Sequence, residues 1–256
     1  MALSLALFFF SGANSSADTA TYRPLDHLWW GTRDLAETPS LVVLGAGTAL
    51  TVVALTLDTG VHDYFAGHDR LGGAARIGND YIGTGIPGAI LAAGTLGFGL
   101  WRDRQHEIDS GEAQLEGLVA TGAYTELLKF TVRRARPDSG NLQSFPSGHT
   151  SIAFSSAASL MELHGPSLGV PALVLAAFTG VCRLDVNAHH LSDVIFGAAL
   201  GYAVGQSYAL HHQCMGGQRR VAPAAQCESQ GQAAQVALLP YFDGRSDFGV
   251  AARLKF

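Results

Sequence analysis

The stretch that decides the fold runs from Lys129 to Asp193, where three polar segments interrupt an apolar sequence rich in Ala and Gly. The first reads Lys129-Phe-Thr-Val-Arg133-Arg134-Ala-Arg136-Pro137, and the second reads Pro146-Ser147-Gly148-His149-Thr150. The third comprises Cys182-Arg183, His189-His190 and Asp193. Charged groups beside apolar runs cost free energy unless they are paired. Together the three segments predict a site for a phosphate-sized anion.

The first polar segment is predicted to end a helix. On that helix Lys129, Arg133 and Arg136 fall at positions i, i+4 and i+7, which share one face. Pro137 is then expected to end the helix. Arg136 would lie at the C-terminus of that helix, where a positive charge interacts favourably with the helix dipole. Taken alone, this pattern fits equally well a basic cluster at a membrane edge.

The second polar segment has the composition of a helix start that binds an anion. Pro146 fixes the entry, Ser147 can cap the helix, and Gly148 lets a ligand approach the backbone closely. The free N–H groups of the helix that begins near Thr150 then point at a negative charge. His149 stands beside that position, where it can deliver a proton. Taken alone, it is equally compatible with an ordinary helix-start histidine.

The third polar segment pairs an imidazole with a carboxylate. His189 and Asp193 are spaced i and i+4, so on a helix Asp193 would fix the tautomer of His189 and raise the nucleophilicity of its distal nitrogen. Arg183 offers a planar fork for phosphate oxygens. His190 points elsewhere on such a helix and receives no role.

Composition favours a single domain with much apolar surface. The 256 residues suffice for one substantial domain. Charged residues make up 14% and hydrophobic residues 48%, with a mean hydropathy of +0.19. The net charge of −5 argues against general nucleic-acid binding, which needs a broad basic face.

Apolar runs predict an all-α bundle of about six helices, followed by a short β-hairpin. The predicted helices cover 40–57, 86–101, 115–134, 150–163, 167–182 and 191–210, with a short amphipathic helix around 25–36. The runs 40–57, 86–101, 167–182 and 191–210 approach the length that spans a bilayer. Residues 58–85 are expected to form a solvated loop and amphipathic helix rather than a metal site at His62, Asp63 and His68, and 102–116 to form a polar connector. Two strands, 236–242 and 248–256, flank the turn at 243–246.

The start of the chain suggests export. Residues 1–17 resemble an export signal or an anchor, although the usual positive charges at the start are absent. Residues 18–210 would then form the helical domain, and 211–256 a polar tail that carries the hairpin. Cys214 and Cys227 flank a polar loop and could pair in an oxidising compartment, whereas Cys182 is expected to be a small buried residue.

The three segments, in this order, resemble the type 2 phosphatidic acid phosphatase (PAP2) superfamily. The pattern is Lys129 to Arg136-Pro137, then Pro146-Ser147-Gly148-His149, then Arg183, His189 and Asp193. The third motif of that family usually begins Ser-Arg, where this chain has Cys182-Arg183. The motifs cover 129–193, and the helical core of the family would extend over most of 40–210.

The resemblance implies a role for each motif residue. His189 is the nucleophile that takes the phosphoryl group, Asp193 orients it, and His149 is the general acid. The phosphate oxygens are held by Lys129, Arg136, Ser147, Gly148 and Arg183. Three fixed cations do the work that a metal does in many phosphatases, so no metal or other cofactor is expected. Arg133 matches no position of the family.

The leading interpretation is therefore a membrane phosphatase acting through a phosphohistidine, with a lipid phosphate or diphosphate as substrate and a site that faces the periplasm from the inner membrane. A soluble, exported acid phosphatase of broad specificity is the first alternative. A vanadate-dependent haloperoxidase uses the same residues and is the second. A transporter or structural bundle would leave the motif residues without a purpose.

Overall fold

The computed structural model describes residues 29, 31–36, 38–67, 70–215, 235–242 and 248–255. Residues 31–34 form a helical turn within the short helix predicted around 25–36. The helices and strands that follow, in chain order, are α2 (Thr38–Phe65), α3 (Gly73–Asp80), the 3₁₀ helix η1 (Ile82–Thr84), α4 (Ile86–Arg102), α5 (Gln105–Val132), α6 (Gly148–His164), α7 (Pro166–Asp185), α8 (Leu191–Met215), β1 (Gln235–Phe242) and β2 (Phe248–Lys255). The predicted export segment 1–17 lies outside the described residues.

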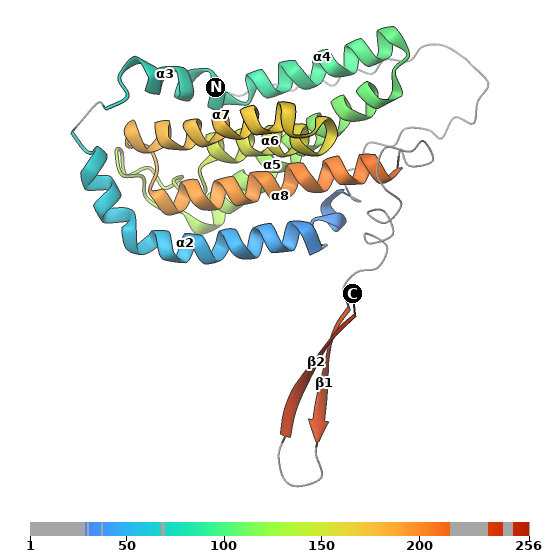
Figure 1. The fold of residues 1–256 in the computed structure, drawn as a ribbon. Coiled ribbons are helices and arrows are strands. Elements are labelled where there is room, and N and C mark those ends of the chain that lie inside the picture. Colours follow the sequence, from blue (N-terminus) through green and yellow to red (C-terminus); the bar gives the residue numbers. More distant parts are fainter. Residues whose placement is uncertain are drawn as a thin grey trace.

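The helical bundle that the apolar runs predict is confirmed, and α8 lies at its centre. Helix α8 contacts α2, α5 and α6, while α6 also contacts α7 and α4 packs along α5 (Figure 1). The core around α8 includes Leu200, Val204 and Tyr208, with Ala120 of α5 packed against them. Burial of these apolar side chains is the main free-energy gain on folding.

Glycines bring α8 unusually close to α6. A Cβ atom on Gly197 would lie 2.7 Å from the carbonyl oxygen of Ser147, and one on Gly201 or Gly205 would collide with the carbonyl oxygen of Ser151 or Ser155. The three glycines are spaced four residues apart, so they share one face of α8. This close packing fixes the start of α6 against the start of α8, where the second and third polar segments lie.

The amphipathic helix expected within 58–85 is present as α3, but the start of that region and part of the predicted connector 102–116 belong to long helices, which corrects the sequence interpretation. Residues 105–116, within the expected connector, form the first three turns of α5, because Ser110 and Gln114 are buried inside the bundle despite their polarity. Helix α2 continues to Phe65, eight residues past the predicted end at Leu57. Asp58, expected in solvent, is therefore buried on that helix.

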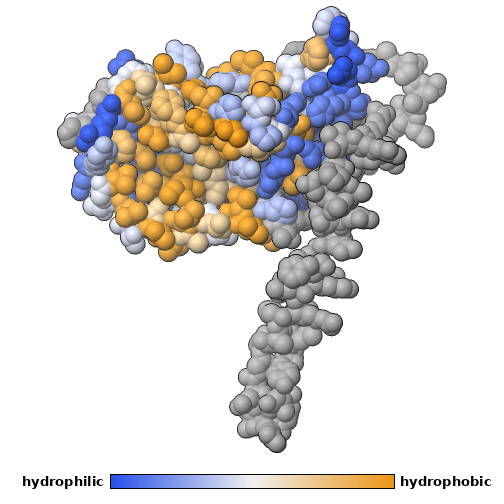
Figure 2. All heavy atoms as spheres, in the orientation of Figure 1, coloured by the Kyte–Doolittle hydropathy of each residue, from blue (hydrophilic) through white to orange (hydrophobic). Residues whose placement is uncertain are grey.

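Within the described residues, two helices have the length and hydropathy to cross a membrane, Pro39–Phe65 and Pro166–Asp185. A third candidate is the bent pair Gly73–Thr84 and Ile86–Arg102, which meet at 45°. The predicted span 191–210 is not among these candidates, and α8 is the central helix of the bundle. Exposed apolar side chains on the candidate helices include Val42, Leu50, Val52, Ile90, Leu100 and Val174. Figure 2 shows hydrophobic residues across the middle of this face and hydrophilic residues towards both ends of the helices.

The predicted C-terminal hairpin is present. Strands β1 and β2 pair antiparallel, with Phe242 opposite Phe248 and Gln235 opposite Lys255. Cys214 lies in the last turn of α8, so one residue of the expected Cys214–Cys227 pair is helical, while Cys227 lies outside the described residues. Cys182 is fully buried, as predicted.

Candidate functional site

All three polar segments meet at one end of the bundle. The first follows the end of α5, the second opens α6, and the third occupies the connection between α7 and α8 (Figure 1). Because α5 and α7 run towards this end while α6 and α8 start from it, residues far apart in the sequence come together here.

The first segment does not present its cations on one helical face, which corrects the prediction. Helix α5 ends at Val132, and Arg133 adopts a left-handed conformation with φ 52° at the C-cap. Arg136 therefore lies in the loop, where its N–H donates to the carbonyl of Asn141 at 2.9 Å. Lys129 remains in the last helical turn, with its side chain 11% exposed and its Nζ 3.1 Å from Glu126 Oε1.

The second segment forms a helix start beside Lys129. Ser147 occupies the N-cap position, but its hydroxyl contacts Thr150 Oγ1 at 2.9 Å and makes no hydrogen bond to the backbone of the first turn. A Cβ on Gly148 would lie 3.1 Å from Lys129 Nζ, and one on Gly83 of η1 would lie 2.9 Å from the His149 ring. Lys129 thus lies at the start of α6, while η1 covers His149.

In the third segment, the contacts of His189 fix its tautomer. Its Nδ1 lies 2.7 Å from the carbonyl oxygen of Ser144. A carbonyl only accepts, so Nδ1 must carry the proton and donate, which leaves the lone pair of the neutral ring on Nε2. Burial lowers the pKa of His189 below its ordinary value and favours this neutral form. The ring therefore has the protonation state of a nucleophile.

Asp193 acts on His189 less directly than predicted. His189 precedes α8, and its Nδ1 lies 3.9 Å from Asp193 Oδ2, which is too far for a hydrogen bond. Instead Oδ2 accepts from Ser144 Oγ at 2.5 Å and from the N–H of His190 at 2.9 Å. Asp193 therefore positions Ser144 by accepting its hydroxyl, and the carbonyl of Ser144 in turn positions His189. The charge of Asp193 remains close enough to stabilise a positive imidazole ring.

Arg134 and Asp58 complete this network, and the sequence interpretation assigned neither of them. Arg134 Nη1 donates to Asp193 Oδ1 at 2.6 Å, and its Nη2 donates to Asp58 Oδ2 at 2.7 Å. Asp58 also accepts from the backbone N–H and the hydroxyl of Ser192, at 2.9 and 2.6 Å. A carboxylate from α2 thus satisfies a free N–H in the first turn of α8. The basic character of 133–136 was the only sequence signal for this contact.

The other cations of the three segments, Lys129, Arg136 and Arg183, together have the properties of an anion-binding site. The Nε atoms of Arg136 and Arg183 are buried without a hydrogen-bond partner in the described part of the chain. Buried donors of this kind are costly unless a ligand satisfies them. Burial, together with the nearby charges of Arg183, Lys129 and Arg136, lowers the pKa of His149 to about 3. Positive charge therefore converges on His149, and a phosphate-sized anion fits the site.

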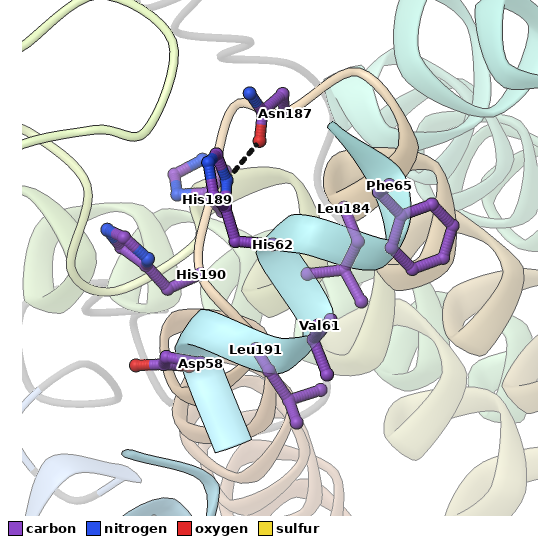
Figure 3. A pocket seen from close by; sticks show the side chains of 9 residues that line it. All are labelled: Asp58, Val61, His62, Phe65, Leu184, Asn187, His189, His190 and Leu191. Carbon is purple, nitrogen blue, oxygen red and sulfur yellow. Dashed lines mark hydrogen bonds between the residues drawn. The ribbon is translucent and has the colours of Figure 1, made fainter. Parts of the chain in front are cut away.

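A small pocket opens beside His189 towards the end of α2. Its lining includes Asp58, His62, Leu184 and Asn187, and the hydrogen bond between His62 Nδ1 and Asn187 Oδ1 measures 2.9 Å (Figure 3). His62 thus has a protein partner at Nδ1. His68 lies outside the described residues.

The site combines a neutral histidine with a carboxylate-held network and converging cations, an arrangement that suits phosphoryl transfer. Residues 113–215 match the model of the PAP2 superfamily, so the resemblance drawn from the three polar segments is confirmed. That match includes all three segments and helices α6 to α8.

Three curated relatives are lipid A 1-phosphatases. The protein of Porphyromonas gingivalis is 38% identical over 93 residues, which cover 35% of this chain and 21% of that protein. Those of Rhizobium etli and Rhizobium johnstonii are each 37% identical over 101 residues, covering 33% of this chain and 42% and 40% of the relatives. The matches thus span less than half of the length of each relative. A solved structure similar to this chain is that of a PAP2-type phosphatidylglycerolphosphate phosphatase of Bacillus subtilis, with a TM-score of 0.40 and 20% identity, covering 72% of this chain and 92% of the other.

Proposed function

We propose that this protein is a membrane phosphatase that removes a phosphate group from a lipid through a phosphohistidine at His189. The observation that carries the proposal is the convergence of a buried, neutral His189 with Arg136 and Arg183, whose buried Nε atoms have no hydrogen-bond partner among the described residues. The names of the relatives make the phosphorylated headgroup of a lipid such as lipid A the first candidate substrate.

In the proposed first step, the Nε2 lone pair of His189 attacks phosphorus while the bond from phosphorus to the lipid oxygen breaks. His149 gives its proton to that leaving oxygen. In the second step, a water molecule attacks phosphorus, the bond to Nε2 breaks, and His149 takes the proton of the water. Asp193 stabilises the positive ring of the intermediate.

The proposed phosphate contacts follow from the positions of the cations. Lys129, Arg136 and Arg183 neutralise the oxygens, and the N–H groups at the start of α6, with Ser147 and Gly148, complete the cradle. Charge stabilisation by fixed donors is the main requirement of phosphoryl transfer. We therefore propose that catalysis needs no metal.

Activity measurements on a substrate panel test this proposal. Purified protein should release phosphate from lipid phosphates faster than from soluble phosphomonoesters, and activity should persist in excess chelator. Vanadate, which mimics the pentacoordinate transition state, should inhibit it. Loss of activity in chelator with recovery on adding Mg²⁺ would contradict the metal-free mechanism. Halide oxidation by peroxide in the presence of vanadate would establish the haloperoxidase alternative instead.

Proton uptake on anion binding tests the role of His149. With a pKa of about 3, its imidazole is neutral at neutral pH, and a bound dianion offsets the cations that depress this pKa. Binding of vanadate or phosphate should therefore take up a proton, so affinity should rise as pH falls. Calorimetry in buffers of different ionisation enthalpy measures this uptake. The variant His149→Gln should bind without it, and unchanged uptake in that variant would reject the assignment.

The exposed apolar surfaces of α2, α4 and α7 support a bilayer location, with the site at one membrane face. We propose that this face is the periplasmic face of the inner membrane. The protein should stay with membranes during extraction at high pH and high salt. Release into the soluble fraction would favour the exported acid phosphatase.

A further inference from the structure

Three metal-ligating side chains meet at the end of the bundle opposite the candidate active site. His106 and Glu107 lie in the first turn of α5, and His164 is the last residue of α6. One ligand atom from each residue lies within 4.8 Å of the other two, and all three residues are half-buried. The two imidazole centroids are 5.5 Å apart with an interplanar angle of 75°.

The three ligands lie at the turns of two helical hairpins, α4–α5 and α6–α7, which fix the position of their backbone. Asp103, in the left-handed conformation, ends α4 directly before α5, and Gly165, with φ 76°, joins α6 to α7. Hydrogen bonds from Glu107 N to Arg104 O and from Gly165 N to Met161 O, both 3.0 Å, order the two turns. The ligand atoms thus converge from rigid helix ends, which is the arrangement that a metal site needs.

The protein surroundings leave the coordinating atoms available. Within the described residues, no hydrogen bond or salt bridge engages the side chains of His106, Glu107 or His164. The coordinating atoms of the two histidines therefore lie near the Glu107 carboxylate and make no hydrogen bond within the described residues.

We propose that His106, Glu107 and His164 bind a divalent transition-metal ion, with Zn²⁺ the best fit. Two imidazole nitrogens and one carboxylate oxygen are donors that Zn²⁺ prefers, and a water molecule would complete a tetrahedral shell. The ion would tie the start of α5 to the end of α6. Along α5, His106 and Lys129 are about 35 Å apart at 1.5 Å per residue, so the metal takes no part in phosphoryl transfer.

Metal titration of the purified full-length chain in detergent tests this site. After chelator treatment, the protein should bind one Zn²⁺ per chain by calorimetry and elemental analysis, and binding should raise the melting temperature. Co²⁺ in place of Zn²⁺ should give the visible absorption of a four-coordinate site. His164→Gln and Glu107→Gln should each weaken binding at least tenfold and remove the rise in melting temperature, with phosphate release unchanged.

Two control variants separate this site from other sources of affinity. Asp103→Asn removes a nearby negative charge outside the ligand set and should bind Zn²⁺ as the parent does. His189→Ala should also keep the one-to-one stoichiometry, which excludes capture by the active-site histidines. Absence of stoichiometric binding, or undiminished binding in both His164→Gln and Glu107→Gln, would overturn the proposal.

Discussion

Replacing His189 with alanine is expected to reduce phosphate release by about four orders of magnitude or more, because the variant has no atom to accept the phosphoryl group. The fold should survive. The change removes one hydrogen bond, from Nδ1 to the Ser144 carbonyl, which contributes about 1 kcal/mol to the free energy of unfolding. Initial rates on a lipid phosphate, measured together with the melting temperature, check both expectations.

The neighbouring histidine provides a matched control. The side chain of His190 reaches the carbonyl of Ala135 at 3.3 Å, and the proposed mechanism gives it no role. His190→Ala should therefore release phosphate at a rate close to that of the parent. Near-normal turnover by a folded His189→Ala protein would show that another residue is the nucleophile.

Replacing Asp193 with asparagine is the second substitution expected to have a large effect, of about 10³- to 10⁴-fold in kcat by analogy with other orienting carboxylates. The amide keeps the shape but loses the charge that Arg134 pairs with at 2.6 Å and that stabilises the His189 ring. The KM should change little, because Asp193 makes no proposed contact with phosphate. Steady-state kinetics on folded protein separate the two parameters. A raised KM with an unchanged kcat would contradict a positioning role.

The matched change Asp58→Asn should have a smaller effect, about 10- to 100-fold, because Asp58 acts on His189 only through Arg134 and Ser192. It should also lower the melting temperature, since Arg134 loses a charged partner on α2. If Asp58→Asn lowered kcat as much as Asp193→Asn, the two carboxylates would act on His189 as one unit. That result would contradict an indirect action of Asp58 through Arg134 and Ser192.

The three polar segments can be picked out from the sequence because their residue types are costly in an apolar chain. Lys129, His149, Arg183 and His189 were singled out on that ground, and the structure brings them to one end of the bundle. The helical runs were equally clear, since apolar stretches of bilayer length leave few alternatives.

Contacts made by distant residues could not be predicted in this way. Asp58 lies at the edge of an apolar run and resembles a loop residue, yet its partner Ser192 is 134 positions away. The sequence predicts a polar connector at the start of α5, near Gln114, because a buried Gln has no local sequence signature. The i, i+4 spacing of His189 and Asp193 suggested a direct hydrogen bond, whereas the helix starts two residues later and Ser144 lies between them.

The most direct test of the account is to trap the intermediate. Purified protein is mixed with a lipid carrying ³²P in its phosphate group, quenched in alkali within the turnover time, digested and mapped by mass spectrometry. Label is expected on the peptide that contains His189, stable to base and lost in acid, and absent from His189→Ala. Turnover without any labelled protein, or label on a different residue, would contradict it.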